Sequence, residues 1–290
     1  MHPASSIIAF TTLSGLGFGL LFWLGIDATA PTGWVGLVFF AMGFALAGGG
    51  LVASTFHLGR RERALKAFTQ WQTSWLSREA WAASAALLVM GLYAIGPVVF
   101  GSQIAVLGWL GAALCLATVY TTSMIYAQLR TVPRWHHWST SALFLALSVT
   151  GGALLSGRVS IALVLLLASG GLQLWWWQQG DRRFGASGST MASATGLGSI
   201  GKVRAFEPPH TGTNYLMREM VHVIGRRHAS KLRLIALTLM MVVPVILLIL
   251  PFGHVFALIA VLAHLAGVAT ARWLFFAEAE HVVGLYYGKR

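Results

Sequence analysis

The chain alternates between long apolar runs and short polar segments. A helix needs about 20 apolar residues to cross the hydrocarbon core of a bilayer, and eight runs approach or exceed that length. They are Ile7–Ile26, Trp34–Phe56, Ala80–Phe100, Ile104–Ala127, Trp138–Ser156, Ser160–Trp177, Leu234–Leu250 and Val255–Phe276. Lipid cannot satisfy free backbone groups, so each run is predicted to be a helix. The pattern predicts an all-α integral membrane protein, an eight-transmembrane-helix bundle.

Composition supports this class. Hydrophobic residues make up 57% of the 290 residues and charged residues 10%, whereas soluble proteins contain roughly 25% charged residues. These values exclude a soluble globule and a disordered chain. The single cysteine, Cys115, lies in an apolar run and is interpreted as a small packed residue. One cysteine excludes a disulfide framework, and also a four-cysteine zinc site or an iron–sulfur cluster held by this chain alone.

The basic residues predict the orientation. With eight spans, both termini lie on one side of the membrane, and of the 20 Lys and Arg residues only Arg158 falls on the other side. Loops rich in Lys and Arg stay in the cytoplasm. We therefore expect a multi-pass protein of the bacterial inner membrane with both termini cytoplasmic. The net charge of +12 then reflects topology and a partner protein, and nucleic acid is not an expected partner.

The spans are predicted to form a single membrane domain over residues 1–290, with two notable cytoplasmic segments. Residues 57–79 form a short loop dense in charge, and residues 179–232 form the longest loop. Within the long loop, Gly180–Gly201 is rich in Gly, Ser, Ala and Thr, a composition typical of a flexible tether.

The second half of the long loop has a different pattern. Thr213–Ser230 carries apolar residues at helical spacing with Arg218 and Arg226 elsewhere around the helix, which predicts an amphipathic surface helix. Two interpretations stay open and can coexist. The helix lies in the membrane interface, or it docks a peripheral subunit through residues such as Arg218 and Arg226.

The densest candidate site follows the second span, where His57 precedes Arg60, Arg61 and Arg63. A histidine at the hydrocarbon edge can donate to a quinone carbonyl and exchange protons near neutral pH. A nearby arginine can stabilise the anionic reduced form. The alternative is a surface histidine beside a charge cluster that only sets topology, and composition by itself favours that alternative.

Two further groups lie on the same predicted face. Arg78 and Glu79 stand at the start of the third span, where they pair with each other or mark an ordinary helix start. Arg272 lies in the last span, and Glu278 and His281 follow at its cytoplasmic end. Two proton-active clusters on one face suggest a site where protons and electrons separate. The carboxylates are equally compatible with a solvated tail.

A haem is not expected. A transmembrane haem needs axial ligands, usually histidines, that face each other from different helices. Within the spans only His264 lies deep, and no facing partner is evident. The spans are otherwise almost free of ionisable groups at mid-depth, which transporters and proton pumps usually carry. The pattern thus favours neither a cytochrome nor a transporter.

Together these residues resemble the membrane anchor subunit of dimethyl sulfoxide reductase and its relatives, the DmsC family (DmsC/NrfD-like bundles). The resemblance covers nearly the whole chain apart from the Gly/Ser-rich tether, and the order and spacing of short motifs carry it. The matching segments are His2-Pro3-Ala4, Phe10-Thr11-Thr12-Leu13-Ser14-Gly15, Ser54-Thr55-Phe56-His57-Leu58-Gly59 with Arg63-Ala64, Thr131-Val132-Pro133 with Trp135, and Arg272.

The resemblance implies a role in electron transport. Such anchors bind a quinone (ubiquinone or menaquinone) and exchange electrons with a ferredoxin-like iron–sulfur subunit, which serves a molybdopterin catalytic subunit. The clusters and the molybdopterin belong to those partners, and the anchor holds no metal or haem and does not act on the sulfur substrate. Carried over by position, the resemblance makes His57 the leading quinone residue and Arg60–Arg63 the edge that docks the iron–sulfur subunit.

The predicted topology distinguishes two branches of the family. In bacterial dimethyl sulfoxide reductases the catalytic subunits face the periplasm, whereas the charge pattern here places the His57 loop in the cytoplasm. The chain looks more like the anchors of cytoplasm-facing, quinone-linked sulfite dehydrogenase (the SoeC type), through Trp75–Glu79 and Glu278–His281. We therefore expect sulfite oxidation coupled to quinone reduction. A menaquinol-oxidising anchor of an S-oxide reductase and a purely structural tether are the alternatives.

Overall fold

The computed structural model describes residues 1–56, 60–207, 209–221, 224–251 and 253–288. Within these residues, eight helical spans are long and apolar enough to cross a membrane, as the sequence predicts. Seven are built on single helices: α1 (Ser5–Ile26), α2 (Gly33–Thr55), α3 (Trp75–Ile95), α4 (Ala105–Ala127), α5 (Trp138–Leu155), α6 (Val159–Ala186) and α10 (His254–Ala277). A π-turn, η2 (Gly96–Phe100), extends α3.

The span before α10 is composite and runs over Arg226–Ile249. Its parts are the end of the short helix η4 (Ile224–His228), then α8 (Ala229–Leu237), the π-turn η5 (Thr238–Val242) and α9 (Val243–Ile249). Pro244 stands in the first turn of α9. Because proline lacks an NH and its ring crowds the preceding turn, it accounts for the wider turn just before it.

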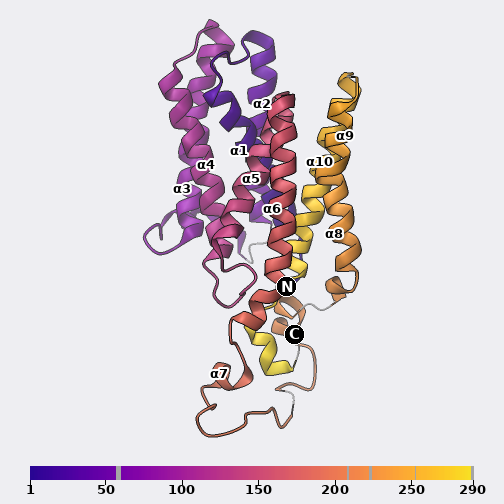
Figure 1. Ribbon diagram of the computed structural model, residues 1–290. Helices are drawn as coiled ribbons and strands as arrows, with labels where there is room; N and C mark the ends of the chain where they lie inside the picture. The colour runs from indigo at the N-terminus through magenta and orange to yellow at the C-terminus, as the bar shows by residue number, and fades with distance from the viewer. Residues whose placement is uncertain (57–59, 208, 222–223, 252, 289–290) are drawn as a thin grey trace.

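The spans stand side by side in one elongated bundle, and both termini lie at its lower end (Figure 1). α1 and α5 are the most enclosed spans, with 61% and 67% of their most apolar stretch buried. Since α1 packs against α2, α4, α5 and α10, it forms the centre of the bundle. The long segment after α6 lies below the spans and contains the short helix α7 (Met191–Thr195).

Small residues let the central helices approach closely, as is common in membranes. A Cβ atom on Gly19 of α1 would lie 1.9 Å from the carbonyl oxygen of Ser148 on α5. A Cβ on Gly152 of α5 would lie 2.2 Å from the Gly19 backbone. Gly17 makes a similar contact with the backbone of Ala47 on α2. Glycine at these crossings therefore sets the distances between α1 and its neighbours.

An aromatic cluster fills the core at the lower end. Trp135 stacks on Phe275 with 4.9 Å between ring centroids, and Trp176 stacks on the same ring at 5.4 Å. Tyr126 packs edge-on against Trp135 and Phe275. The Trp135 indole NH also donates to the Phe275 carbonyl oxygen over 2.9 Å. Because the cluster joins α4, α6 and α10, it fixes the position of the end of α4.

A network of ion pairs ties the same end together, and we call it the charge clamp: Arg134, Asp181, Arg233 and Glu278. Arg134, before α5, pairs with Asp181 of α6 at 2.5 Å and with Glu278 after α10 at 3.5 Å. Arg233 of α8 pairs with the same carboxylates at 2.6 Å and 2.7 Å. Both oxygens of Glu278, which is 3% exposed, thus face an arginine, as a buried carboxylate requires.

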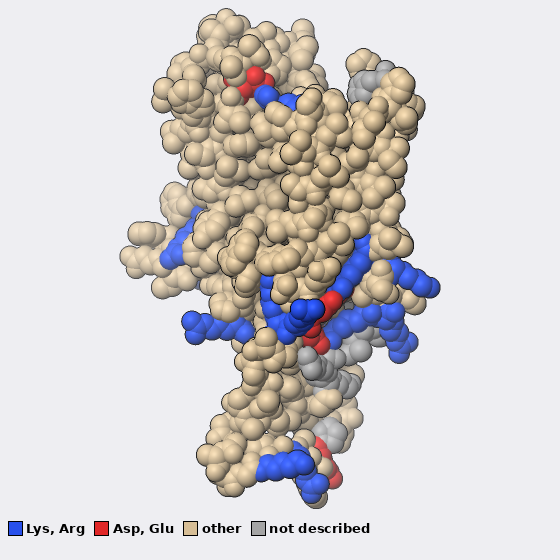
Figure 2. Space-filling model, viewed as in Figure 1, with Lys and Arg blue, Asp and Glu red and all other residues tan. Residues whose placement is uncertain are grey.

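Charge is distributed unevenly along the bundle. Figure 2 shows Lys and Arg side chains gathered around the lower end of the spans and in the segment below. At the other end, Arg158 forms an ion pair with Asp27 and lies over the Trp23 ring. Arg158 is the one Lys or Arg residue predicted to lie on the non-cytoplasmic side, and Asp27 neutralises its charge.

The start of the third span differs from the prediction. α3 begins at Trp75 rather than Ala80, so Arg78 and Glu79 lie inside its first turns. They do not pair with each other, because Arg78 bonds to backbone carbonyls and Glu79 to a threonine.

The end of the sixth span also differs. α6 continues to Ala186 instead of ending near Trp177, so the first residues of the predicted tether Gly180–Gly201 are helical. Asp181 in this extension belongs to the charge clamp. Its two arginine partners come from distant parts of the chain and stabilise turns that the local Gly-rich sequence does not favour.

The prediction of one continuous surface helix over Thr213–Ser230 is wrong. The described part consists of the π-turn η3 (Leu216–Met220), η4 and the first residues of α8. The His2 NH donates to the Glu219 carbonyl oxygen over 2.7 Å, and the Asn214 amide donates to the Tyr287 hydroxyl over 3.0 Å. These contacts with residues near both ends of the chain fix the segment, and local helical spacing cannot reveal them.

The close approach of α1 and α5 makes a stability prediction. Gly152→Ala is expected to lower the midpoint of thermal unfolding in detergent by several degrees, because an added Cβ must push the helices apart and overpacking typically costs about 1–3 kcal/mol. Gly49→Ala is the matched control, since a Cβ there meets nothing within 4 Å. Equal midpoints for the two variants would contradict the packing described.

Candidate functional site

A groove opens at the lower end of the bundle, beside the charged loop after α2. It is bounded by parts of α1, α2, α3 and α4 and by the short helix η1 (Arg61–Phe68). Its volume is about 520 Å³, within the range of about 300–1,000 Å³ common for small-molecule sites. Basic, hydroxyl and apolar side chains share the lining, among them Arg60, Arg63, Lys66, Ser54, Thr55, Ser77, Phe10, Leu76, Ile125 and Tyr126.

No carboxylate is among the described residues that line the basic side of the groove. Arg60, Arg63 and Lys66 are exposed, and none of them forms an ion pair within the described part of the chain. Glu62 lies in the same short helix but is exposed as well. The groove therefore presents a positive field toward a ligand or a partner.

The loop that carries these charges is fastened to α3. The Trp81 indole NH donates to the Phe68 carbonyl oxygen over 3.0 Å, and the Ser77 hydroxyl accepts from the Gln70 NH over 3.2 Å. Arg78 donates to the Trp71 and Gln72 carbonyl oxygens over 3.0 Å and 2.7 Å. Arg78 thus holds the loop in shape and does not line the groove.

Sequence reasoning missed two residues at this end of α4, of which one lines the groove and the other holds Glu79. Tyr126 lines the groove and is held by the aromatic cluster. Thr122, one turn earlier on α4, donates its hydroxyl to Glu79 over 2.5 Å, and this carboxyl is 4% exposed. The only sequence signal was a hydroxyl and a phenol four residues apart at the end of an apolar run.

Some of the residues predicted to bind quinone lie at the groove, and others lie away from it or outside the described residues. Arg60 lines the groove, Glu79 lies just behind it, and Arg63, predicted for docking, lines it too. His57 lies outside the described residues. Arg61 stands in η1, where only its backbone is described.

Arg272 stands behind the groove. It is 3% exposed on α10, and its guanidinium carbon lies 3.5 Å from the centroid of the Phe144 ring. Phe144 also contacts Tyr126 at 5.8 Å between centroids. Two aromatic rings therefore separate this charge from the groove, which it does not line.

The predicted second cluster, Glu278 and His281, does not reach the groove. Glu278 is part of the charge clamp, which joins helices instead. The His281 Nδ1 atom accepts from the Val283 NH over 3.0 Å at the start of η6 (Val282–Tyr287). Burial, together with the nearby amino group of Met1, lowers the pKa of His281 and so favours the neutral ring that accepts this bond. We leave both residues out of the site.

The predicted docking arginines of the long loop differ from each other. Arg218 is exposed on η3. Arg226 pairs with Glu280 at 3.1 Å, which ties the start of the composite span to the end of the chain. Arg218 is therefore the better candidate for contact with a partner.

Known proteins that resemble this chain include membrane anchor subunits. The profile of the DMSO reductase anchor subunit (DmsC) family matches residues 1–169, which include every residue of the groove. A sulfite dehydrogenase subunit of Allochromatium vinosum is 31% identical over 330 aligned positions, covering 99% of each chain. The anaerobic dimethyl sulfoxide reductase chain YnfH of Escherichia coli K12 is 35% identical over 128 positions, covering 42% of each chain.

The family profile spans more than half of the chain, and the similarity to a sulfite dehydrogenase subunit extends from end to end. This full-length similarity supports the sulfite dehydrogenase branch that the sequence motifs indicate. With its eight apolar helical spans, the chain is a multi-pass membrane protein and belongs to the DMSO reductase anchor subunit (DmsC) family.

Proposed function

We propose that this chain is the quinone-reactive anchor of a molybdenum and iron–sulfur oxidoreductase, and that the groove between α1, α2, α3 and α4 is its quinone site. The observation that carries the proposal is the uncompensated positive charge of Arg60 and Arg63 on a groove of about 520 Å³ at the edge of the spans. The groove also lies within the region that defines the family.

The groove fits the chemistry of a quinone. A quinone has a flat apolar ring with two carbonyl acceptors and a long apolar tail. Phe10, Leu76 and Ile125 supply apolar contacts, and Arg60 and Arg63 supply cationic NH donors. When bound, the quinone takes up two electrons and two protons and becomes a quinol.

The roles of this chain's residues follow from their places. Arg60 and Arg63 orient the carbonyl oxygens and favour negative charge on them. The Tyr126 phenol closes the inner wall, and the buried Glu79 carboxyl, held by Thr122, holds a proton near that wall. His57 stays a prediction from the family resemblance, because it lies outside the described residues.

The proposed partners and orientation extend the family assignment. The exposed Arg60, Arg63 and Arg218 form a basic surface suited to an acidic ferredoxin-like iron–sulfur subunit, which connects to a molybdopterin catalytic subunit. The full-length similarity to a sulfite dehydrogenase subunit supports sulfite oxidation coupled to quinone reduction. An S-oxide reductase that oxidises menaquinol is the second candidate, since a shorter match leads to a dimethyl sulfoxide reductase chain.

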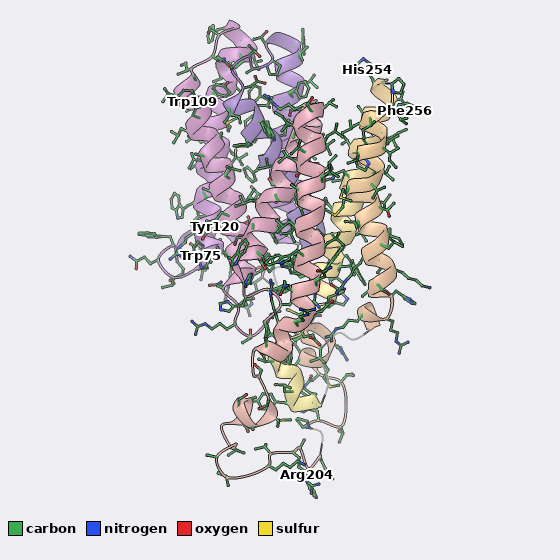
Figure 3. The ribbon with its side chains drawn as sticks, viewed as in Figure 1. Trp75, Trp109, Tyr120, Arg204, His254 and Phe256 are labelled. Atoms are coloured by element: carbon green, nitrogen blue, oxygen red, sulfur yellow. The ribbon has the colours of Figure 1, made fainter. Side chains whose placement is uncertain are left out.

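The orientation makes a labelling prediction. Cys115 is 0% exposed, so the natural chain is a silent background for a membrane-impermeant maleimide. Ser102→Cys, between α3 and α4, is expected to react in intact bacterial spheroplasts. Ser199→Cys is expected to react only after the membrane is broken, because it is exposed in the long segment after α6, which lies below the spans and carries Arg204 (Figure 3). The reverse pattern would overturn the cytoplasmic placement of the groove.

The quinone site makes a kinetic prediction. Arg63→Gln is expected to lower kcat/KM for quinone in the purified complex by about tenfold to a hundredfold, because it removes a charge-assisted hydrogen bond. Arg130→Gln is the control, since Arg130 is exposed at the same end but does not line the groove.

The amount of each partner in the complex is measured beside the rates, so that a lost partner is not mistaken for lost quinone chemistry. His57→Ala is expected to act in the same direction with assembly intact. If neither variant changes quinone turnover, the chain is a structural tether.

The partners are tested by isolating the tagged chain in mild detergent and sequencing the amino termini of whatever accompanies it. We expect a molybdopterin subunit without a twin-arginine leader and a ferredoxin-like subunit. A twin-arginine leader would instead indicate a periplasmic S-oxide reductase, and no molybdopterin partner at all would contradict the anchor role.

A further inference from the structure

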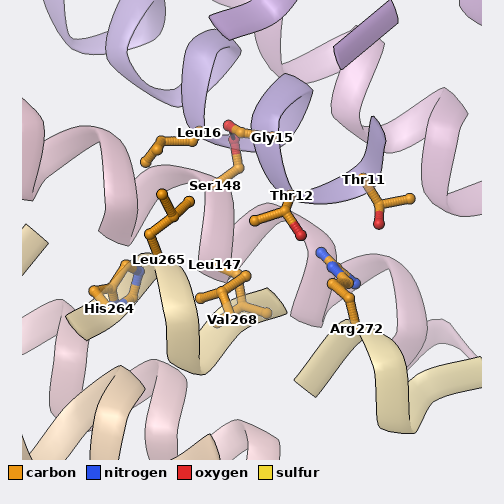
Figure 4. Close-up of a pocket in the computed structure, with 10 residues that line it drawn as sticks. All are labelled: Thr11, Thr12, Gly15, Leu16, Leu147, Ser148, His264, Leu265, Val268 and Arg272. Atoms are coloured by element: carbon orange, nitrogen blue, oxygen red, sulfur yellow. Dashed lines mark hydrogen bonds between the residues drawn. The ribbon is translucent and has the colours of Figure 1, made fainter. Parts of the chain in front are cut away.

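A small cavity lies inside the bundle between α1, α5 and α10, apart from the groove. Its volume is about 10 Å³, close to the least space that one water molecule needs. Figure 4 shows the residues around it. The lining combines apolar side chains with polar ones, which include Thr12, Ser148, His264 and Arg272.

Three of the polar lining groups have no partner in the described protein. The Thr12 Oγ1, His264 Nε2 and Arg272 Nε atoms are buried and lack a hydrogen bond. These side chains are 5%, 3% and 3% exposed, respectively. Buried polar atoms are almost always satisfied. Seven buried side-chain atoms of the described residues lack a hydrogen bond, and three of them gather around this one cavity, which indicates missing polar occupants.

The donors and acceptors around the cavity are complementary to water. The His264 Nδ1 atom lies 2.7 Å from the Met240 carbonyl oxygen, which can only accept, so Nδ1 carries the hydrogen and a neutral Nε2 offers a lone pair. Arg272 offers NH donors, and the Thr12 hydroxyl can both donate and accept. His264 and Arg272 stand eight residues apart on α10, about 12 Å along the helix axis, so a water beside Thr12 and Arg272 leaves the His264 Nε2 atom to a second water.

Arg272 has the greatest need for such an occupant. No described residue forms an ion pair with it or accepts a hydrogen bond from it, and its described cationic contact is the Phe144 ring at 3.5 Å. A charge within the membrane is costly without polar solvation. Figure 4 shows the Thr12 hydroxyl turned toward this guanidinium.

The neighbouring hydroxyls supply a contrast. Thr11 lines the same cavity, but its hydroxyl donates to the Ile7 carbonyl oxygen of its own helix over 2.9 Å. The Ser148 hydroxyl donates to the Gly15 carbonyl oxygen over 2.5 Å. Of the three hydroxyls, only that of Thr12 makes no hydrogen bond within the described residues.

We propose that the cavity between α1, α5 and α10 is an internal water site, and that Thr12 acts through this water on Arg272, keeping the guanidinium solvated and in place behind the groove. Arg272 lies against the Phe144 ring, which in turn contacts Tyr126 on the groove wall. The water therefore supports a positive charge that favours reduction in the groove. This second part rests on the proposed function, whereas the water site itself does not.

The water site is tested by radiolytic hydroxyl labelling of the purified complex, read residue by residue by mass spectrometry. Internal water forms radicals where it is bound, so Leu147 and Val268, which line the cavity and are 4% and 7% exposed, are expected to be labelled. Phe18 and Leu21, at 1% and 0% exposed, form the dry reference. Thr12→Val is expected to reduce the labelling at least twofold and Thr11→Val to leave it unchanged. No labelling above the dry reference in the natural chain would overturn the proposal.

The action on Arg272 is tested by a double-mutant cycle on quinone turnover. Thr12→Val is expected to lower the rate about threefold to tenfold, the effect of one lost hydrogen bond, and Thr11→Val to leave it within twofold. In an Arg272→Gln background, Thr12→Val is expected to have no further effect. Additive losses would show that Thr12 acts independently of Arg272. A natural complex that never reacts with quinone would refute the proposed function, while the labelling result would still decide the water site.

Discussion

Charge inside a lipid bilayer is stable only when the protein itself supplies its partners. The whole arrangement of this chain follows from that constraint. Arg158 is matched by Asp27 at one end, and the charge clamp matches two arginines with two carboxylates at the other. Between these ends, Glu79 is held by a threonine and Arg272 by an aromatic ring. Three of the buried polar atoms that lack a hydrogen bond within the described residues gather at one cavity between α1, α5 and α10.

The lower rim of the bundle divides into two parts on this basis. In the charge clamp, opposite charges cross-link α6, α8 and α10, and the site they form is structural. Around the groove, exposed Arg60 and Arg63 have no carboxylate partner in the part of the chain that the structure describes, so their charge is available to a ligand or a partner subunit. Arginine thus has two uses at this end of the bundle. Where a carboxylate reaches the guanidinium, the arginine joins helices, and where none does, its charge faces the groove.

Packing places the groove where it is. Glycine contacts draw α2 and α5 close to α1, and the aromatic cluster fixes the end of α4 together with Tyr126. The loop after α2 is fastened to α3 by bonds from Trp81 and to Ser77. The groove lies between the end of α4 and this fastened basic loop. In this position at the end of the spans, it suits a lipid-soluble molecule.

The sequence by itself determined the eight spans, the charge asymmetry and the family, because a bilayer imposes its length and polarity on every residue locally. It also pointed to Arg60, since a charge beside a span is visible without a fold. Only the tertiary structure decided that Glu278 serves the charge clamp, that Thr213–Ser230 is not one helix, and that Tyr126 lines the groove while Thr122 holds Glu79. Those outcomes depend on which distant residues meet, as Asp181 meets Arg134 and Arg233, and the pattern along a single helix contains no information about such meetings.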